Sequence, residues 1–217
     1  MCVEETLDAT AGQRSESGTG TAAVDHAVRY VEERHWDVFP GAWLEIVGGQ
    51  VHCCCRDPQC PSPGAHPMQR EWANTAVSTP SAAQRLWSEQ PRAAVLLPTG
   101  RTFDTLDVPE TAGFLALARL ERYEQRTGPV LVTPGGRMHF LALPGAANAL
   151  TEELRKLGYA PDRLDLRGHG KGEWIPAPPT RVGTLGPVQW VQPPTAENRW
   201  LPEASELVPA LAYACAR

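Results

Sequence analysis

The chain has 217 residues, 42% of them hydrophobic, which is enough for a sizeable core in one domain of ordinary to large size. Its formal net charge is −5, so no overall basic field attracts nucleic acid, and any such contact requires a local patch. No apolar run reaches the roughly 20 residues of a membrane span, and the first residues lack the basic and apolar regions of a signal peptide. We therefore expect a cytoplasmic protein with no membrane partner, in which disulfides do not persist.

The chain is expected to begin with a tail and a helix. Residues 1–20 are polar and small, which predicts a disordered tail, and residues 21–217 are predicted to form a single domain. Apolar residues recur at helical spacing over 24–31, so a helix is expected there, with Thr19 or Thr21 as its N-cap.

Strand and loop signals alternate through the middle of the chain. Residues 36–52 read as strands interrupted by Pro40-Gly41, and residues 53–70 as a loop. A short helix is expected from Ser78 or Ser81. Residues 93–108 predict two strands joined in a hairpin-like turn at Thr99-Gly100.

The C-terminal half predicts further helices and short strands. The expected elements are a helix over 109–128, a strand–turn–strand unit over 128–145, a helix over 147–159, short β segments over 164–180 and 186–194, and a helix over 203–216. Strands that follow one another without an intervening helix predict an α+β fold, with a mixed or antiparallel sheet flanked by helices.

A cysteine-rich stretch, "CCCRDPQCPSPGAH" over 53–66, predicts a zinc-binding loop. Three thiolates and one imidazole form a tetrahedral set for structural Zn²⁺, and binding would order a loop that has little apolar content. The expected ligands are Cys53, Cys55, Cys60 and His66. Cys54 is expected to point away, and His52 is an alternative ligand. The other readings of this stretch are free or buried thiols, or a catalytic or redox thiol.

An acidic stretch, "FDTLDVPETAG", carries the second candidate site. Two acids two residues apart on a strand share a face and are able to hold two Mg²⁺ ions. Here that spacing joins Asp107 to Pro109, so the pair is interrupted. Asp104 and Asp107 are three residues apart and are expected on opposite faces of the strand. Asp107 is equally well suited to cap the helix that starts near Pro109.

Five stretches, taken together and in this order, resemble a known family. They are "CRDPQCPSPGAHP" with Trp72 and "NTA", "LLPTGRTFDTLDVPETAG", "VTPGGRMHF", "LDLRGHGKGEWIPAPPT" and "LGPVQW". The chain resembles the N-terminal primase–polymerase domain of the archaeo-eukaryotic primase superfamily, in particular the bifunctional DNA primase/polymerase family of the actinobacterial type. The resemblance runs from about His52 to Trp190 and implies a primase–polymerase-like α+β domain with a Cys/His loop.

The resemblance implies specific roles for residues of the site. The three metal-binding acids of the family correspond to Asp107, Pro109 and Asp165. Proline cannot bind metal, and Glu110, one position along, substitutes for the missing acid only if the backbone kinks. Nucleotide-binding positions correspond to His139, Arg167 and Gly136, with the glycine pair one place early in the turn. In this sequence His139 is equally consistent with a core histidine, and His169 and Lys171 are expected to be merely solvated.

An active member would extend a nucleic-acid strand from nucleotides on a DNA or RNA template, using Mg²⁺ or Mn²⁺, and a helicase is an expected protein partner. Because Pro109 replaces an acid, the alternative is a non-catalytic descendant that binds a nucleotide, nucleic acid or a protein partner.

Overall fold

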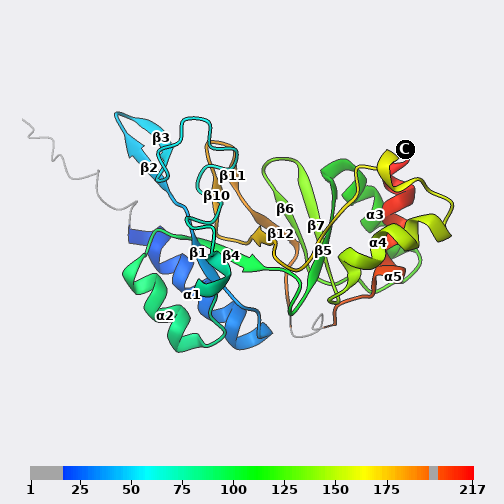
Figure 1. Ribbon diagram of the computed structural model, residues 1–217, viewed down its shortest axis with the longest axis horizontal. Coiled ribbons are helices and arrows are strands. Elements are labelled where there is room, and N and C mark those ends of the chain that lie inside the picture. The colour runs from blue at the N-terminus through cyan, green and yellow to red at the C-terminus, as the bar shows by residue number, and fades with distance from the viewer. Residues whose placement is uncertain (1–16, 196–199) are drawn as a thin grey trace, which may run out of the picture.

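The computed structural model describes residues 17–195 and 200–217 (Figure 1). These residues contain five α-helices, in the places where the sequence predicts helices. The helices are α1 (Ser17–Arg34), α2 (Pro80–Glu89), α3 (Glu110–Arg122), α4 (Ala146–Lys156) and α5 (Ala204–Cys215). None of the helices in the described part of the chain is long and apolar enough to cross a membrane.

The first helix begins earlier than the sequence predicts. Residues 1–16 of the expected disordered tail lie outside the described residues, but residues 17–20 belong to α1. Because α1 begins at Ser17, Thr19 and Thr21 lie inside the helix and are not its N-cap.

The centre of the molecule is a five-stranded sheet in the order β12-β6-β7-β5-β8, and every neighbouring pair is antiparallel. Its strands are β5 (Asp104–Pro109), β6 (Val130–Thr133), β7 (Arg137–Ala142), β8 (Arg167–His169) and β12 (Gln189–Gln192). Together with the helices, this sheet confirms the α+β fold class, with antiparallel pairing.

The two faces of β5 have different surroundings because side chains alternate along a strand. Leu106 and Val108 pack in the core that α3, α4 and α5 form against one face of the sheet. Asp104 lies towards the same helices, where its Oδ2 accepts hydrogen bonds from the backbone N–H groups of Gly145 (2.9 Å) and Ala147 (3.0 Å) at the start of α4. Asp107 has different neighbours, contributed by β7 and β8, so the predicted opposite orientation of the two aspartates is confirmed.

The remaining strands form smaller sheets beside α1 and α2 (Figure 1). They are β1 (Phe39–Gly41), β2 (Leu44–Val47), β3 (Gln50–Cys53), β4 (Ala94–Pro98), β9 (Trp174–Pro176), β10 (Arg181–Val182) and β11 (Gly186–Pro187).

A second hydrophobic core joins this part to the central sheet: Trp36, Phe103 and Ile175 pack with Leu131 and Leu141 of β6 and β7. The core therefore covers the β6–β7 side of the sheet face that also carries Asp107.

The predicted hairpin between residues 93–100 and 101–108 is wrong. β4 pairs with β1 and β9, whereas β5 pairs with β7 and β8 in the central sheet. Between them the chain passes from one sheet to the other. Gly100, at φ +88°, lies so close to the backbone of Lys171 that an added Cβ would be 2.2 Å from it. This glycine therefore permits close backbone contact at the crossing and does not form a hairpin turn.

Candidate functional site

Asp107 lies at the centre of the central sheet, between two neighbouring strands. Its register partners are His139 on β7 and Arg167 on β8, so all three side chains start from the same sheet face. Arg137 and His169 lie two residues from these partners and share that face by strand alternation. The sheet thus brings a buried carboxylate together with two histidines and two arginines.

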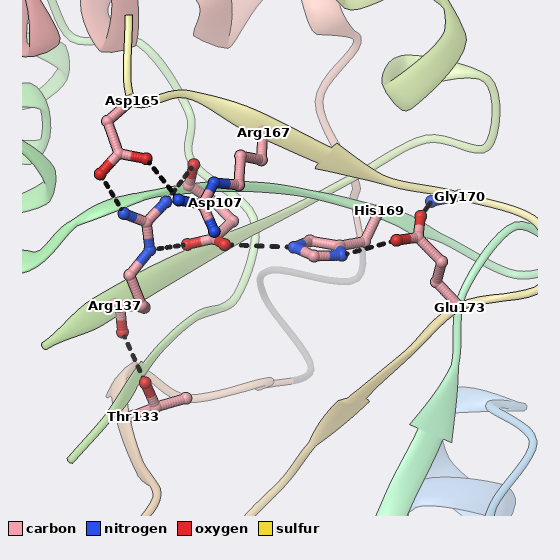
Figure 2. A network of polar contacts seen from close by, with 8 residues as sticks. All are labelled: Asp107, Thr133, Arg137, Asp165, Arg167, His169, Gly170 and Glu173. Carbon is pink, nitrogen blue, oxygen red and sulfur yellow. Dashed lines mark hydrogen bonds and ion pairs between the residues drawn. The ribbon is translucent and has the colours of Figure 1, made fainter. Parts of the chain in front are cut away.

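Arg137 links the two aspartates that the sequence proposes as metal ligands (Figure 2). Its Nε donates to Asp107 Oδ1 at 2.7 Å, and its Nη1 donates to Asp165 Oδ2 at 2.5 Å. Its Nη2 also donates to the backbone carbonyl of Asp107 at 3.3 Å. The carboxylates of Asp107 and Asp165 therefore converge on one point, and a guanidinium group occupies that point.

The other predicted acidic positions do not join this group. Pro109 lies opposite Arg137 in the β5–β7 ladder and offers no ligand. Glu110 begins α3, and its backbone N–H donates to Gly136 O at 2.9 Å. Among the described residues, no hydrogen bond, ion pair or metal-ligand group joins the Glu110 carboxylate to Asp107. Pro109, and not Asp107, is the N-cap residue of α3, so the helix-capping reading of Asp107 is wrong.

Two histidines flank Asp107 on its other side. His169 Nε2 lies 3.1 Å from Asp107 Oδ2, and His169 Nδ1 lies 3.1 Å from Glu173 Oε1. The rings of His139 and His169 are 5.6 Å apart, centroid to centroid. The expectation that His169 is merely solvated is wrong, because both ring nitrogens contact carboxylates (Figure 2).

Burial and charge set the protonation of this group. Burial lowers the pKa of His139 to about 4, so its imidazole is neutral at pH 7. The hydrogen bond to Asp107 raises the pKa of His169 above its ordinary value. Burial opposes ionisation of Asp107, but its contacts with His169, His139 and Arg137 outweigh burial and hold its pKa below the ordinary value. Asp107 is therefore a carboxylate whose charge is already balanced inside the protein.

A cleft of about 490 Å³ opens beside His169. Its walls include Pro61 and Ser62 of the cysteine-rich loop, Thr133 and Gly135 of the β6–β7 turn, and Glu173 and Trp174 around β9. Ligand pockets commonly have volumes of about 300–1,000 Å³, so the cleft is large enough for a small molecule. The side chain of Arg167 is 65% exposed, and its Nη2 lies 3.1 Å from Asp165 Oδ1.

The cysteine-rich loop forms a second cluster of possible metal ligands. Ligand atoms of Cys53, Cys55, Cys60 and His66 all lie within 4.8 Å of one another. Cys53 Sγ is 3.3 Å from His66 Nε2, close to the ~3.6 Å that separates a sulfur and a nitrogen on a tetrahedral zinc ion. His66 Nδ1 lies 2.8 Å from the carbonyl oxygen of Pro67, which leaves Nε2 for a metal. The four predicted residues therefore fit a structural zinc ion.

The neighbours of these residues do not belong to the cluster. Cys54 Sγ accepts from the backbone N–H of Trp43 and lies 3.6 Å from Met68 Sδ, so it points away as predicted. His52, the alternative ligand, is an exposed residue of β3 and is absent from the cluster that the described residues form.

Sequence reasoning missed Arg137, His169 and Glu173 as site residues. The available signal was strand spacing: Arg137 lies two residues before His139, and His169 two residues after Arg167. Only the antiparallel register of β7 and β8 against β5 brings these positions to Asp107.

Comparison with known proteins identifies the family of the chain. The sequence profile of one family, described as Bifunctional DNA primase/polymerase, N-terminal, matches residues 27–207. No curated protein and no solved structure gives a match. The matched residues include most of the chain, both candidate sites and the cleft between them. The chain therefore belongs to the bifunctional DNA primase/polymerase N-terminal family.

Proposed function

We propose that this primase/polymerase-like domain binds a nucleotide in the cleft beside His169 and does not carry out template-directed nucleotidyl transfer. The observation that carries the proposal is the Arg137 bridge between Asp107 and Asp165. The guanidinium of Arg137 neutralises Asp107 and Asp165, the two acids that would otherwise hold a catalytic ion.

The residues present do not fit the pair of Mg²⁺ or Mn²⁺ ions that the family implies. Mg²⁺ requires nearly octahedral oxygen coordination, usually from carboxylates, water and substrate phosphates. Arg137 binds the carboxylates of both Asp107 and Asp165, and Pro109 stands where the family has a further acid, two residues after Asp107. An entering ion would have to displace a partly buried guanidinium group and meet its positive charge.

Several features support nucleotide binding without such ions. Arg167 is mostly exposed, and its ion pair with the half-exposed Asp165 is of a kind that contributes little energy. Arg167 lies on the same sheet face as His169 of the cleft, two residues away, and a guanidinium is able to bind phosphate oxygens through two parallel hydrogen bonds. Trp174 and Pro176 supply an apolar wall of the cleft for a base. Gly135 of the β6–β7 turn lines the same opening, whereas the backbone N–H of Gly136 is already bonded to Thr133 O at 3.0 Å.

Nucleotidyl transfer is the second candidate, and one observation favours it. Asp107 and Asp165 reach the same guanidinium although 58 positions separate them, so the acids are close enough to share a ligand. In that case Arg137 would have to leave the site before ions bind.

Titration calorimetry with a deoxynucleoside triphosphate tests the proposal. We expect binding of the same affinity in Mg²⁺-free buffer and in excess Mg²⁺, because Arg167 and not a metal ion holds the phosphates. Arg167→Ala should weaken binding by roughly tenfold, the equivalent of about 1.4 kcal/mol for a charge-assisted contact. Arg122→Ala, on the opposite, helix-covered side of the sheet, is the matched control and should bind normally. Binding that requires Mg²⁺, or no binding at all, contradicts the proposal.

A further inference from the structure

A group of three side chains on the His169 side of Asp107 has the composition of a transition-metal site. Ligand atoms of Asp107, His139 and His169 all lie within 4.8 Å of one another. One carboxylate and two imidazoles form a set that suits borderline ions such as Zn²⁺ and Fe²⁺, whereas Mg²⁺ prefers oxygen ligands alone. This set is distinct from the acidic pair, because it lies on the Oδ2 side of Asp107 and excludes Asp165.

The separations agree with coordination. Asp107 Oδ2 and His169 Nε2 are 3.1 Å apart. Two adjacent ligands at ~2.1 Å from a tetrahedral or octahedral ion are ~3.0–3.4 Å apart. The pair is thus already placed as two neighbouring ligands of one ion would be.

His139 supplies an independent indication of a ligand. Only 7% of this residue is exposed, and its Nδ1 is buried without a hydrogen-bond partner. A buried polar atom left unpaired costs about 1–3 kcal/mol, so native structures rarely keep one without a reason. A metal ion, or water bound to it, would satisfy the ring of His139 beside Asp107.

The surroundings orient the other two ligands as they do in metalloproteins. Glu173 Oε1 contacts His169 Nδ1 at 3.1 Å, which leaves Nε2 directed at Asp107 (Figure 2). A carboxylate behind a ligating histidine fixes the ring and raises its basicity. Arg137 holds the other oxygen of Asp107, Oδ1, at 2.7 Å. Because His169 and Glu173 also line the cleft, an ion has a path from solvent.

We propose that Asp107, His139 and His169 bind one divalent transition-metal ion of the Zn²⁺ class, with an open coordination position towards the cleft. Three protein ligands and one open position are typical of zinc sites that bind water or a substrate. The Arg137 bridge is compatible with this ion, since it uses only Oδ1 of Asp107 and the carboxylate of Asp165. The site does not depend on nucleotide binding.

Zinc titration of the full chain tests this site. The protein is first loaded with zinc and dialysed against zinc-free buffer, so that the four-ligand cysteine loop remains filled. We expect wild type to take up one further equivalent of Zn²⁺ by calorimetry, and excess Mg²⁺ not to compete. His139→Gln and His169→Gln should lose this equivalent, and Glu173→Gln should weaken it by roughly 10–100-fold. The matched control His52→Gln, at an exposed position of β3, should retain it.

Two outcomes overturn the proposal. One is a wild-type protein that binds no zinc beyond the cysteine loop. The other is a further equivalent that persists in His169→Gln but disappears in Asp165→Asn, which would assign the ion to the acidic pair. If His139→Gln does not fold, by circular dichroism, the variants of the more accessible His169 and Glu173 decide the result.

Discussion

Replacing Arg137 with alanine should lower the free energy of unfolding by roughly 3 kcal/mol, because removal of one partner leaves a buried charge uncompensated. The Asp107 side chain is 6% exposed and depends on Arg137 for a short ion pair. For a chain of this size the loss corresponds to a fall in Tm of roughly 6–12 °C. Thermal and urea unfolding, followed by circular dichroism, measure both quantities.

The control for this prediction is Arg167→Ala. Arg167 also pairs with Asp165, but its own side chain is 65% exposed and that of Asp165 is 48% exposed, so its loss should cost less than about 1 kcal/mol. Arg137→Ala should in addition gain stability in Mg²⁺ or Mn²⁺, because an ion that binds only the folded state stabilises it. An Arg137→Ala protein as stable as Arg167→Ala would show that the bridge does not hold the site together.

Removing zinc from the cysteine-rich loop should lower Tm by on the order of 10 °C. A ligand present at a thousandfold over its Kd stabilises by about 4.1 kcal/mol, and each kcal/mol shifts Tm by about 2–4 °C at this size. The loop has few apolar residues to order it, so we expect metal binding and folding of the loop to be coupled. Metal analysis of purified protein, and melting with and without a chelator, check the effect.

Cysteine variants separate a metal site from ordinary packing of thiols. Cys60→Ser should lose the zinc and show the lower Tm without chelator. Cys54→Ser is the matched control, since Cys54 lies outside the four-residue cluster and should keep the metal. A fully folded, metal-free wild-type protein would refute the zinc assignment.

The cysteine-rich loop and the acidic site are connected through the cleft. Pro61 and Ser62 of the loop form part of its wall, and His169 and Glu173 form another part. We therefore expect that loss of zinc weakens nucleotide binding in the cleft.

Local patterns predicted the helices and the β6–β7 unit because their signals lie within a few residues. The 3.6-residue spacing and short turns carry enough information there. The pairing of β4 was mispredicted because Thr99-Gly100 looks like a turn whether the next strand returns to the same sheet or enters another. That choice depends on residues such as Lys171, which approaches Gly100 only in the folded chain.

The candidate site was predictable only in part. The cysteine spacing identified all four residues of the loop cluster, and Cys54 was correctly left out. The strand period separated Asp104 from Asp107. Arg137 was missed because its role depends on the register of β7 against β5 and on the return of Asp165 from a distant segment. In the sequence, Arg137 is only a basic residue after a glycine turn, and nothing in that local pattern indicates that it binds two aspartates.

Template-directed incorporation of deoxynucleotides tests most directly whether Arg137 replaces the catalytic ions. The assay uses primed and unprimed templates with Mg²⁺ and with Mn²⁺, and compares wild type with Asp107→Ala. We expect no incorporation by wild type above the level of Asp107→Ala, while the nucleotide still binds. Metal-dependent incorporation that wild type shows and Asp107→Ala lacks would contradict it.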